Sequence, residues 1–301
     1  MIKKNLPLFF SFCLIISVLA CQNDKREDKK SKETAKIEKL ASEVKAEKIK
    51  TIFYSLPSPL ELTILFKREG VEYHYEELHD PKKRDAYVTT VKKALNLGVY
   101  GADLSYAGLF AKHADAIQFF SVSQVMAEDL GIGQTFQREF ITRLEKNAAN
   151  KDTLLQVISD FFLENDSYLK DQNQQDISTY VLVGGWIEGL YLGTHMISAK
   201  TSSTGIKEII IGQLNSLDNL ILLLSDIGKS IELNNLKDNM ILLREYYNEV
   251  DYVKIDESEI KTKQESDEIL IDNQQHRHEM NDSTLLKITE TVTEIRNSII
   301  R

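Results

Sequence analysis

Apolar and polar residues follow a helical period along most of the chain beyond residue 58. The segment Ser58-Pro59-Leu60-Glu61 is typical of a helix start, because proline fits the first turn and serine forms a capping box with the following glutamate. The apolar positions that follow at helical spacing are Leu62, Leu65 and Phe66, and Gly70 is a natural stop. The pattern predicts a helix between residues 59 and 69.

The same signals continue to the end of the chain. Asp80-Pro81 repeats the helix start, and a helix follows it whose apolar positions are Tyr87, Val88, Val91, Ala94 and Leu95. Apolar periodicity predicts further helices near residues 96–111, 113–130, 134–147, 151–170, 174–199, 204–227 and 233–249, and a last one in LLKITETVTEIRNSII, residues 285–300. No proline follows residue 81, and this also favours helices.

Strands are expected in one region at most, between Tyr252 and Met280. The segments YVKI and EILID have the composition of short strands and would form a small β-hairpin. We therefore expect an all-α fold, a multi-helix antiparallel bundle with central glycine-rich helices, in which a hairpin near residues 252–280 is an optional addition.

Two of the predicted helices are rich in glycine. In one, small residues share a face at spacings of four and three, and in the other glycine recurs every four residues. Glycine inside a helix costs about 0.5–1 kcal/mol relative to alanine, so a compensating close approach of another helix is expected. The glycines predicted to allow this packing are Gly98, Gly101, Gly108, Gly185, Gly189 and Gly193.

The second glycine-rich helix, YVLVGGWIEGLYLGTHM, residues 180–196, is apolar enough to resemble a membrane span. It carries Glu188 near its centre, however, and an ionisable residue at that depth of a bilayer is costly. A central helix covered by neighbours on every side explains the pattern better. The short likeness between Gly101-Ala-Asp and Gly185-Trp-Ile-Glu also hints at a duplicated helical unit.

Glu188 is the most informative polar residue of this helix. At 3.6 residues per turn, Tyr191 and His195 lie on the same face as Glu188. One interpretation is a buried acid satisfied by a tyrosine hydroxyl, a lysine or the neighbouring histidine. The other is a polar ligand or metal site between helices, which Asp103 of the first glycine-rich helix would join, although Asp103 points away from its glycine stripe.

Motifs for metal or cofactor binding are not found. The segment HRHE, residues 276–279, lacks the ligand spacing of a known metal site, and we expect it in an exposed turn. The chain has no HExxH, phosphate-binding loop, GxGxxG or GxSxG segment. The sequence thus predicts no metal, no cofactor and no assigned catalytic residue.

The first twenty residues have the pattern of an export signal. Lys3 and Lys4 precede the short apolar segment LPLFFSFCLIISVLA, and Ala20 is followed by Cys21. The ending Val-Leu-Ala-Cys resembles the lipobox of bacterial lipoproteins, with Val18 where leucine is usual, and the resemblance covers this segment alone. It implies cleavage before Cys21, diacylation of its sulfur and acylation of its nitrogen.

Cysteine usage agrees with this resemblance. The chain has two cysteines, and cleavage would remove Cys13 and leave Cys21 as the single thiol. An ordinary secretory signal is the alternative, but an exported protein seldom keeps one free thiol. We therefore expect a cleaved signal peptide over residues 1–20, a lipidated cysteine with a charged flexible tether over residues 21–33, and a single helical domain over residues 34–301.

Charge and the residues behind Cys21 bear on location and partners. Gln22 resembles the residue found at this position in lipoproteins sorted to an outer membrane, and the charged cluster behind it is similar to signals for export to the cell surface. The formal net charge is −9, and loss of Lys3 and Lys4 makes it −11 (−9 − 2), which disfavours a nucleic-acid partner. The expected location is the cell envelope, at the periplasmic face or the cell surface of the outer membrane.

Two classes of function are compatible with these features. The first is a lipid-anchored helical module of the envelope, attached through Cys21, which binds an unknown envelope protein or small ligand or has a structural role without catalysis. The second is an envelope enzyme or a small-ligand or metal-binding protein with a polar site around Glu188 and His195, in which Tyr191 and Asp103 take part.

Overall fold

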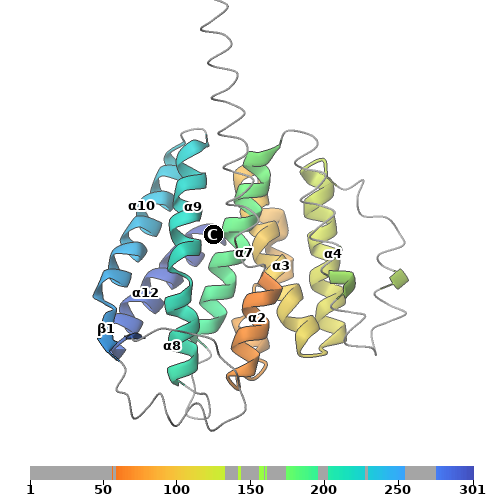
Figure 1. Ribbon diagram of the computed structural model, residues 1–301. Helices are drawn as coiled ribbons and strands as arrows, with labels where there is room; N and C mark the ends of the chain where they lie inside the picture. The colour runs from red at the N-terminus through yellow and green to blue at the C-terminus, as the bar shows by residue number, and fades with distance from the viewer. Residues whose placement is uncertain are drawn as a thin grey trace, which may run out of the picture. The chain divides into compact units, whose positions relative to one another are not determined.

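The computed structural model describes residues 56, 59–132, 142–143, 156–158, 160, 174–195, 203–227, 230–254 and 276–301, which belong to one compact unit, Leu56–Arg301. The helices predicted at 134–147 and 151–170 lie almost entirely outside these residues, as do Cys21 and the tether. Within the described part the fold is an all-α bundle of helices packed against one another, as predicted (Figure 1).

The helices and strands occur in the following order: α2 (Pro59–Arg68), the 3₁₀ helices η1 (Tyr75–Glu77) and η2 (Pro81–Ala86), α3 (Thr90–Leu109), α4 (His113–Asp129), α7 (Gln175–His195), α8 (Ser203–Gly212), α9 (Leu214–Asp226), α10 (Ile231–Tyr246), the 3₁₀ helix η4 (Tyr247–Glu249), β1 (Asp251–Lys254), β2 (His276–Glu279) and α12 (Asp282–Ile299). The predicted helices near 59–69, 113–130, 174–199, 233–249 and 285–300 correspond to α2, α4, α7, α10 and α12.

The predicted helix boundaries were wrong at α3. We expected one helix after Pro81 and another from residue 96, whereas residues 81–86 form a 3₁₀ helix and α3 runs without a break from Thr90 to Leu109. The Thr89 side chain accepts a hydrogen bond from the Lys92 N–H and so caps α3. Val88, counted as an apolar helix position, lies in the connecting turn and is exposed.

The predicted helix at 204–227 is two helices. It breaks at Gln213, between α8 and α9. The Gln213 amide nitrogen donates to the Ile209 carbonyl, and its amide oxygen accepts from Trp186 Nε1 at 3.2 Å. These side-chain bonds stabilise the break from within the core, and the apolar periodicity of the segment does not reveal them.

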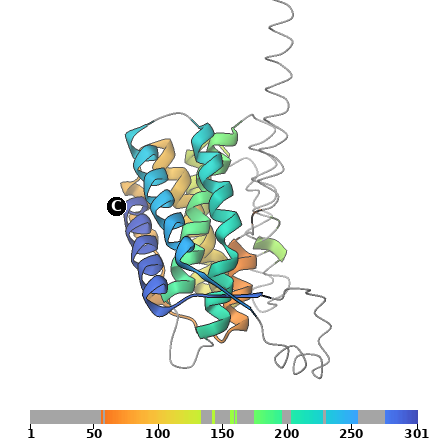
Figure 2. The ribbon, with the colours of Figure 1, turned by 60° about the vertical axis from the view of Figure 1, so that its left-hand side comes forward.

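The predicted β-hairpin exists, but its second strand is elsewhere. β1 pairs antiparallel with β2, with Asp251 opposite Glu279 and Lys254 opposite His276. The segment EILID lies outside the described residues, and HRHE, expected in a turn, forms the strand. The reason is topological: α10 and α12 are antiparallel neighbours, so the chain leaving η4 and the chain entering α12 run side by side (Figure 2).

The two glycine-rich helices, α3 and α7, form the centre of the described bundle (Figure 1). α3 is buried from Ala94 to Leu109 and α7 from Val183 to Thr194, which confirms the prediction of central glycine-rich helices. They run in the same direction, because Gly98 lies against Val181 while Asp103, further along α3, interacts with Glu188. α4 and α12 pack antiparallel to this pair, so the bundle mixes both orientations.

At the closest approach of α3 and α7, each helix places a glycine against a main-chain carbonyl of the other. A Cβ atom at Gly98 would collide with the Val181 carbonyl, and a Cβ atom at Gly184 would collide with the Leu95 carbonyl. The two contacts are equivalent in sequence, because Leu95 precedes Gly98 by three residues and Val181 precedes Gly184 by three residues. These contacts make Gly98 and Gly184 the corresponding positions of the two helices, whereas the sequence likeness had aligned Gly101 with Gly185.

The buried position of α7 agrees with its interpretation as a core helix. Among the described helices, none combines the length and the apolar character that crossing a bilayer requires. α7 instead packs on α2, α3, α8, α9 and α12. Its apolar residues face other helices on every side, as expected for a helix at the centre of a bundle.

Candidate functional site

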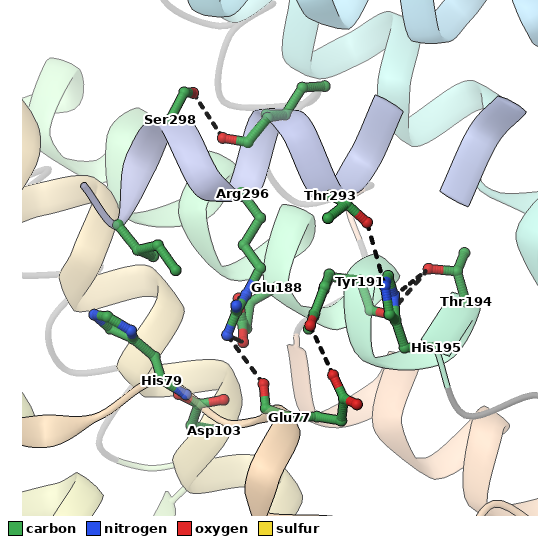
Figure 3. Close-up of polar contacts among 12 residues, drawn as sticks. Glu77, His79, Asp103, Glu188, Tyr191, Thr194, His195, Thr293, Arg296 and Ser298 are labelled. Carbon is green, nitrogen blue, oxygen red and sulfur yellow. Dashed lines mark hydrogen bonds and ion pairs between the residues drawn. The ribbon is translucent and has the colours of Figure 1, made fainter. Parts of the chain in front are cut away.

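A cluster of buried polar side chains lies where α3, α7 and α12 meet the segment between η1 and η2 (Figure 3). α7 contributes Glu188, α3 contributes Asp103, and α12 contributes Arg296. His79 comes from the connecting segment. Two of the four, Glu188 and Asp103, were singled out in the sequence, and the structure brings them together.

Glu188 is held by Arg296 in a two-point ion pair. Arg296 Nε donates to one carboxylate oxygen at 2.6 Å and Nη2 donates to the other at 2.8 Å. Glu188 is 0% exposed and Arg296 is 7% exposed. Burial lowers the pKa of the guanidinium, but the surrounding groups, Glu188 first among them, together raise that pKa above its ordinary value, so Arg296 stays charged. Glu188 is thus a buried acid with an arginine partner, which the sequence interpretation had not considered.

Two further contacts fix the Arg296 guanidinium. Nη2 also donates to the Glu77 main-chain carbonyl at 3.0 Å, and the guanidinium carbon lies 4.0 Å from the centre of the Tyr191 ring. Tyr191 donates its hydroxyl to the Glu77 carboxylate at 2.7 Å. Burial, and then the bond to Glu77, raise the pKa of Tyr191 above its ordinary value. Tyr191 therefore supports Arg296 with its ring and the 75–77 segment with its hydroxyl.

Asp103 lies beside this ion pair. Its Oδ2 accepts a hydrogen bond from the His79 main-chain N–H at 3.1 Å, while its Oδ1 is buried and has no hydrogen-bond partner in the described part of the chain. Burial, and then the charge of Glu188, raise the pKa of Asp103 well above its ordinary value. Asp103 therefore lies beside Glu188 even though it points away from the glycine stripe of α3.

His195 belongs to a different set of contacts. Its Nδ1 lies 3.0 Å from the Tyr191 carbonyl, its Nε2 lies 3.3 Å from the Thr293 hydroxyl, and its ring packs against the Tyr191 ring. Seven residues along a helix correspond to about 10 Å of rise, and Figure 3 shows Tyr191 between Glu188 and His195. Glu188 and His195 therefore share a helix face, but their side chains contact different partners and do not converge on one site.

His79 and its partner Tyr87 were not predicted from the sequence. His79 Nε2 lies 2.6 Å from the Tyr87 hydroxyl, which donates to the Ile300 carbonyl at 3.1 Å. The histidine nitrogen must therefore be the donor to Tyr87. Burial, and then the charge of Arg296, lower the pKa of His79 to about 3, so the ring is neutral near pH 7.

Arg296 was also missed, although the sequence contains a signal for it. It follows Val292 by four residues and precedes Ile299 by three, so it lies on the apolar face of the last helix. A charged residue on a buried face requires a partner of opposite charge. Glu188 would have been a natural candidate.

The predicted glycine positions fall into two kinds of contact. At Gly98 the neighbour is the main chain of α7, including the Gly185 nitrogen at 2.6 Å from the Cβ position. Gly189 and Gly193 instead face the side chains of Leu62 and Phe66 on α2. The other two, Gly101 and Gly108, are buried within α3.

A metal site is not found among the described residues, in which no group of three histidine, cysteine, aspartate or glutamate side chains converges. A surface pocket of about 230 Å³ is lined by Arg84, Asp85, Tyr87, Val88, Lys93, Val125, Met126 and Asp129. None of these residues was predicted as a site residue. Its arginine and lysine are paired with its own acids, Arg84 with Asp85 and Lys93 with Asp129.

Searches among protein families, curated proteins and solved structures find no match to this chain. The fold and the cluster therefore define its class, an all-α bundle built around a parallel pair of glycine-rich helices with a buried glutamate–arginine pair at their junction with α12.

Proposed function

We propose that this protein is a lipid-anchored lipoprotein of the cell envelope whose helical bundle binds an envelope protein or a small ligand, or has a structural role, without catalysis. The anchor is the acylated Cys21, followed by a charged tether. Gln22 favours the outer membrane, at its periplasmic face or at the cell surface. The acidic net charge of −9 speaks against a nucleic-acid partner.

The observation that carries the non-catalytic part of the proposal is the state of Glu188. A general acid or base must reach a proton of the substrate, either directly or through one water. Both carboxylate oxygens of Glu188 accept bonds from Arg296, and the side chain is 0% exposed. These contacts favour a residue that joins α7 to α12 over a residue that meets a substrate.

The alternative, an enzyme or a small-ligand or metal-binding protein with a polar site around Glu188 and His195, requires these two side chains to act together. His195 contacts the Tyr191 carbonyl and Thr293, whereas Glu188 contacts Arg296. A shared metal ion or substrate atom would require both side chains within a few ångströms of one point. Metal analysis of the purified protein lacking residues 1–21 separates the two hypotheses. We expect no metal in stoichiometric amount, and a bound metal that His195→Ala removes would favour the alternative.

The anchor has a direct test in cells that process lipoproteins. The Cys21→Ser variant should incorporate no labelled fatty acid and should leave the membrane fraction, because the thiol that is acylated is gone. The matched control is Cys13→Ser, which changes a cysteine of the segment that is removed and should incorporate label like the wild type. Labelling of the Cys21→Ser variant would contradict the anchor assignment.

A further inference from the structure

The junction of α3, α7 and α12 contains two carboxyl groups and one guanidinium. Asp103 and Glu188 are both 0% exposed, and Arg296 is bound to Glu188 through two nitrogens. If both acids were ionised, the junction would hold an unpaired negative charge out of contact with water. Such a charge is expensive, and buried carboxyl groups avoid it by keeping their protons.

Hydrogen-bond accounting leads to the same conclusion from geometry. Asp103 lies beside Glu188, and a hydrogen bond between the two carboxyl groups requires that one of them carry a proton. With both ionised, Asp103 Oδ1 has no donor in the described part of the chain. A proton on Oδ1 makes this atom a donor, and Glu188, which is rich in acceptor positions, can receive the bond.

The two acids differ in their other partners, and this decides which one keeps the proton. Glu188 receives two bonds from a guanidinium, which stabilise its charged form. Asp103 receives one bond from a neutral main-chain N–H, that of His79. The charged partner selects Glu188 as the carboxylate and leaves Asp103 as the acid.

We infer that Asp103 keeps its proton at neutral pH and donates it through Oδ1 to Glu188, so that α3 and α7 are joined by a hydrogen bond that is lost when the pH rises. The junction is thus a pH-sensitive device within the fold. On deprotonation, two carboxylates face one guanidinium, and the contact between α3 and α7 becomes repulsive.

The tyrosines and the histidine around Asp103 keep their charge state near neutral pH. From α7 it faces Glu188, from α12 it faces Arg296, and from the segments before η1 and η2 it faces Tyr73 and His79, with Tyr100 and Tyr106 on α3 itself. Burial raises the pKa of each of these tyrosines and lowers that of His79 to about 3, so all four are neutral. Asp103, whose pKa is raised by burial and by Glu188, is therefore the group that responds first to alkali.

The sign of the effect on stability follows from linkage. The unfolded chain releases the Asp103 proton above its ordinary pKa of 3.8, whereas the folded protein keeps it. Between the unfolded and the folded pKa the native state binds one more proton, so its stability falls as the pH rises. One such proton changes the unfolding equilibrium constant by up to about tenfold per pH unit.

Urea unfolding of the purified full chain between about pH 5 and about pH 9 tests the inference. Asp103→Asn reproduces the neutral acid, since its amide donates to Glu188 and its oxygen accepts from His79. We expect its stability relative to the wild type to increase steadily as the pH rises. The matched control is Asp238→Asn on the exposed face of α10, which should run parallel to the wild type. If Asp103→Asn also ran parallel, Asp103 would be ionised and the inference overturned.

A second measurement uses the wild type and does not require any variant to fold. In protein labelled with ¹³C-aspartate, one side-chain carboxyl resonance should have the shift of a protonated acid at neutral pH and should titrate above it. Where Glu188→Gln folds, Asp103 becomes the counterion of Arg296, and this resonance should move to the shift of a carboxylate. A wild-type spectrum in which every aspartate is ionised at neutral pH would overturn the inference.

Discussion

Replacing Gly98 by alanine tests the closest contact in the core, where the main chains of α3 and α7 meet. A Cβ atom at residue 98 would collide with the Val181 carbonyl oxygen and lie 2.6 Å from the Gly185 nitrogen. Both neighbours are main-chain atoms of a buried helix, so neither can rotate away. The added methyl group can be accommodated only if the two helices separate.

The expected size of the effect follows from these distances. Ordinary contact of a Cβ atom begins at 3.4 Å, so relief of the Gly185 contact alone requires a movement of about 0.8 Å (3.4 − 2.6), and the Val181 carbonyl requires more. Overpacking of this kind costs about 1–3 kcal/mol or more, while the better helix propensity of alanine returns about 0.5–1 kcal/mol. We expect Gly98→Ala to lower the free energy of unfolding by about 2 kcal/mol.

The assay is urea unfolding of the purified protein followed by far-ultraviolet circular dichroism. Two matched glycines calibrate it. A Cβ atom at Gly212 would meet no heavy atom within 4 Å, and one at Gly189 would lie 2.9 Å from the end of the flexible Leu62 side chain. Gly212→Ala should be neutral or slightly stabilising, and Gly189→Ala should fall between Gly212→Ala and Gly98→Ala.

The reasoning would be refuted if Gly98→Ala unfolded at the same urea concentration and with the same slope as the wild type. The main chains of α3 and α7 would then be further apart than described. A loss of stability in all three alanine variants to the same extent would also contradict it. That outcome would indicate a general response to substitution, unrelated to the distance between the helices.

Three further substitutions probe the contacts of α12 and α7. Arg296→Met leaves the Glu188 carboxyl buried without its guanidinium, and we expect a loss of about 3–5 kcal/mol in chemical unfolding; unchanged stability would show that the ion pair is dispensable. Tyr191→Phe removes the hydrogen bond to Glu77 but keeps the ring against Arg296, so the free energy of unfolding should fall by about 1 kcal/mol. A loss as large as that of Arg296→Met would contradict this division of roles. Asn281→Ala removes the side-chain cap of α12, which contributes about 1 kcal/mol, so amide hydrogen exchange in the first turn of α12 should accelerate. Exchange at the wild-type rate would show that the cap does not stabilise this helix end.

Local signals were sufficient to predict most of the described helices. The proline at residue 59 and the positive-φ glycine at residue 70 bracket α2, and apolar periodicity predicted α4, α7 and α12. Caps and periodicity act within a few residues, so they can be read from the sequence. Periodicity failed at Gln213, where the break between α8 and α9 depends on a bond to Trp186 in another helix.

The glycine pattern predicted close helix packing but not the partner of each glycine. Gly98 lies against the main chain of α7, while Gly189 lies under a leucine of α2. A glycine within a helix lowers the stability of that helix, so it indicates that another element packs closely against that side of the helix. Which element fills that space depends on how distant segments are arranged, and the parallel direction of α3 and α7 was likewise not evident from the sequence.

The polar cluster shows the same division. Glu188 could be identified from the sequence as a buried acid, since a carboxylate in the middle of an apolar helix requires compensation wherever it lies. Its partner Arg296 is 108 residues further along the chain, and neither it nor His79 was predicted to lie beside Asp103. The need for a counter-charge is a property of one side chain and its immediate neighbours. The choice of Arg296 to meet that need, and the proton that we assign to Asp103, depend on three helices and a connecting segment converging at one point, which only the tertiary structure decides.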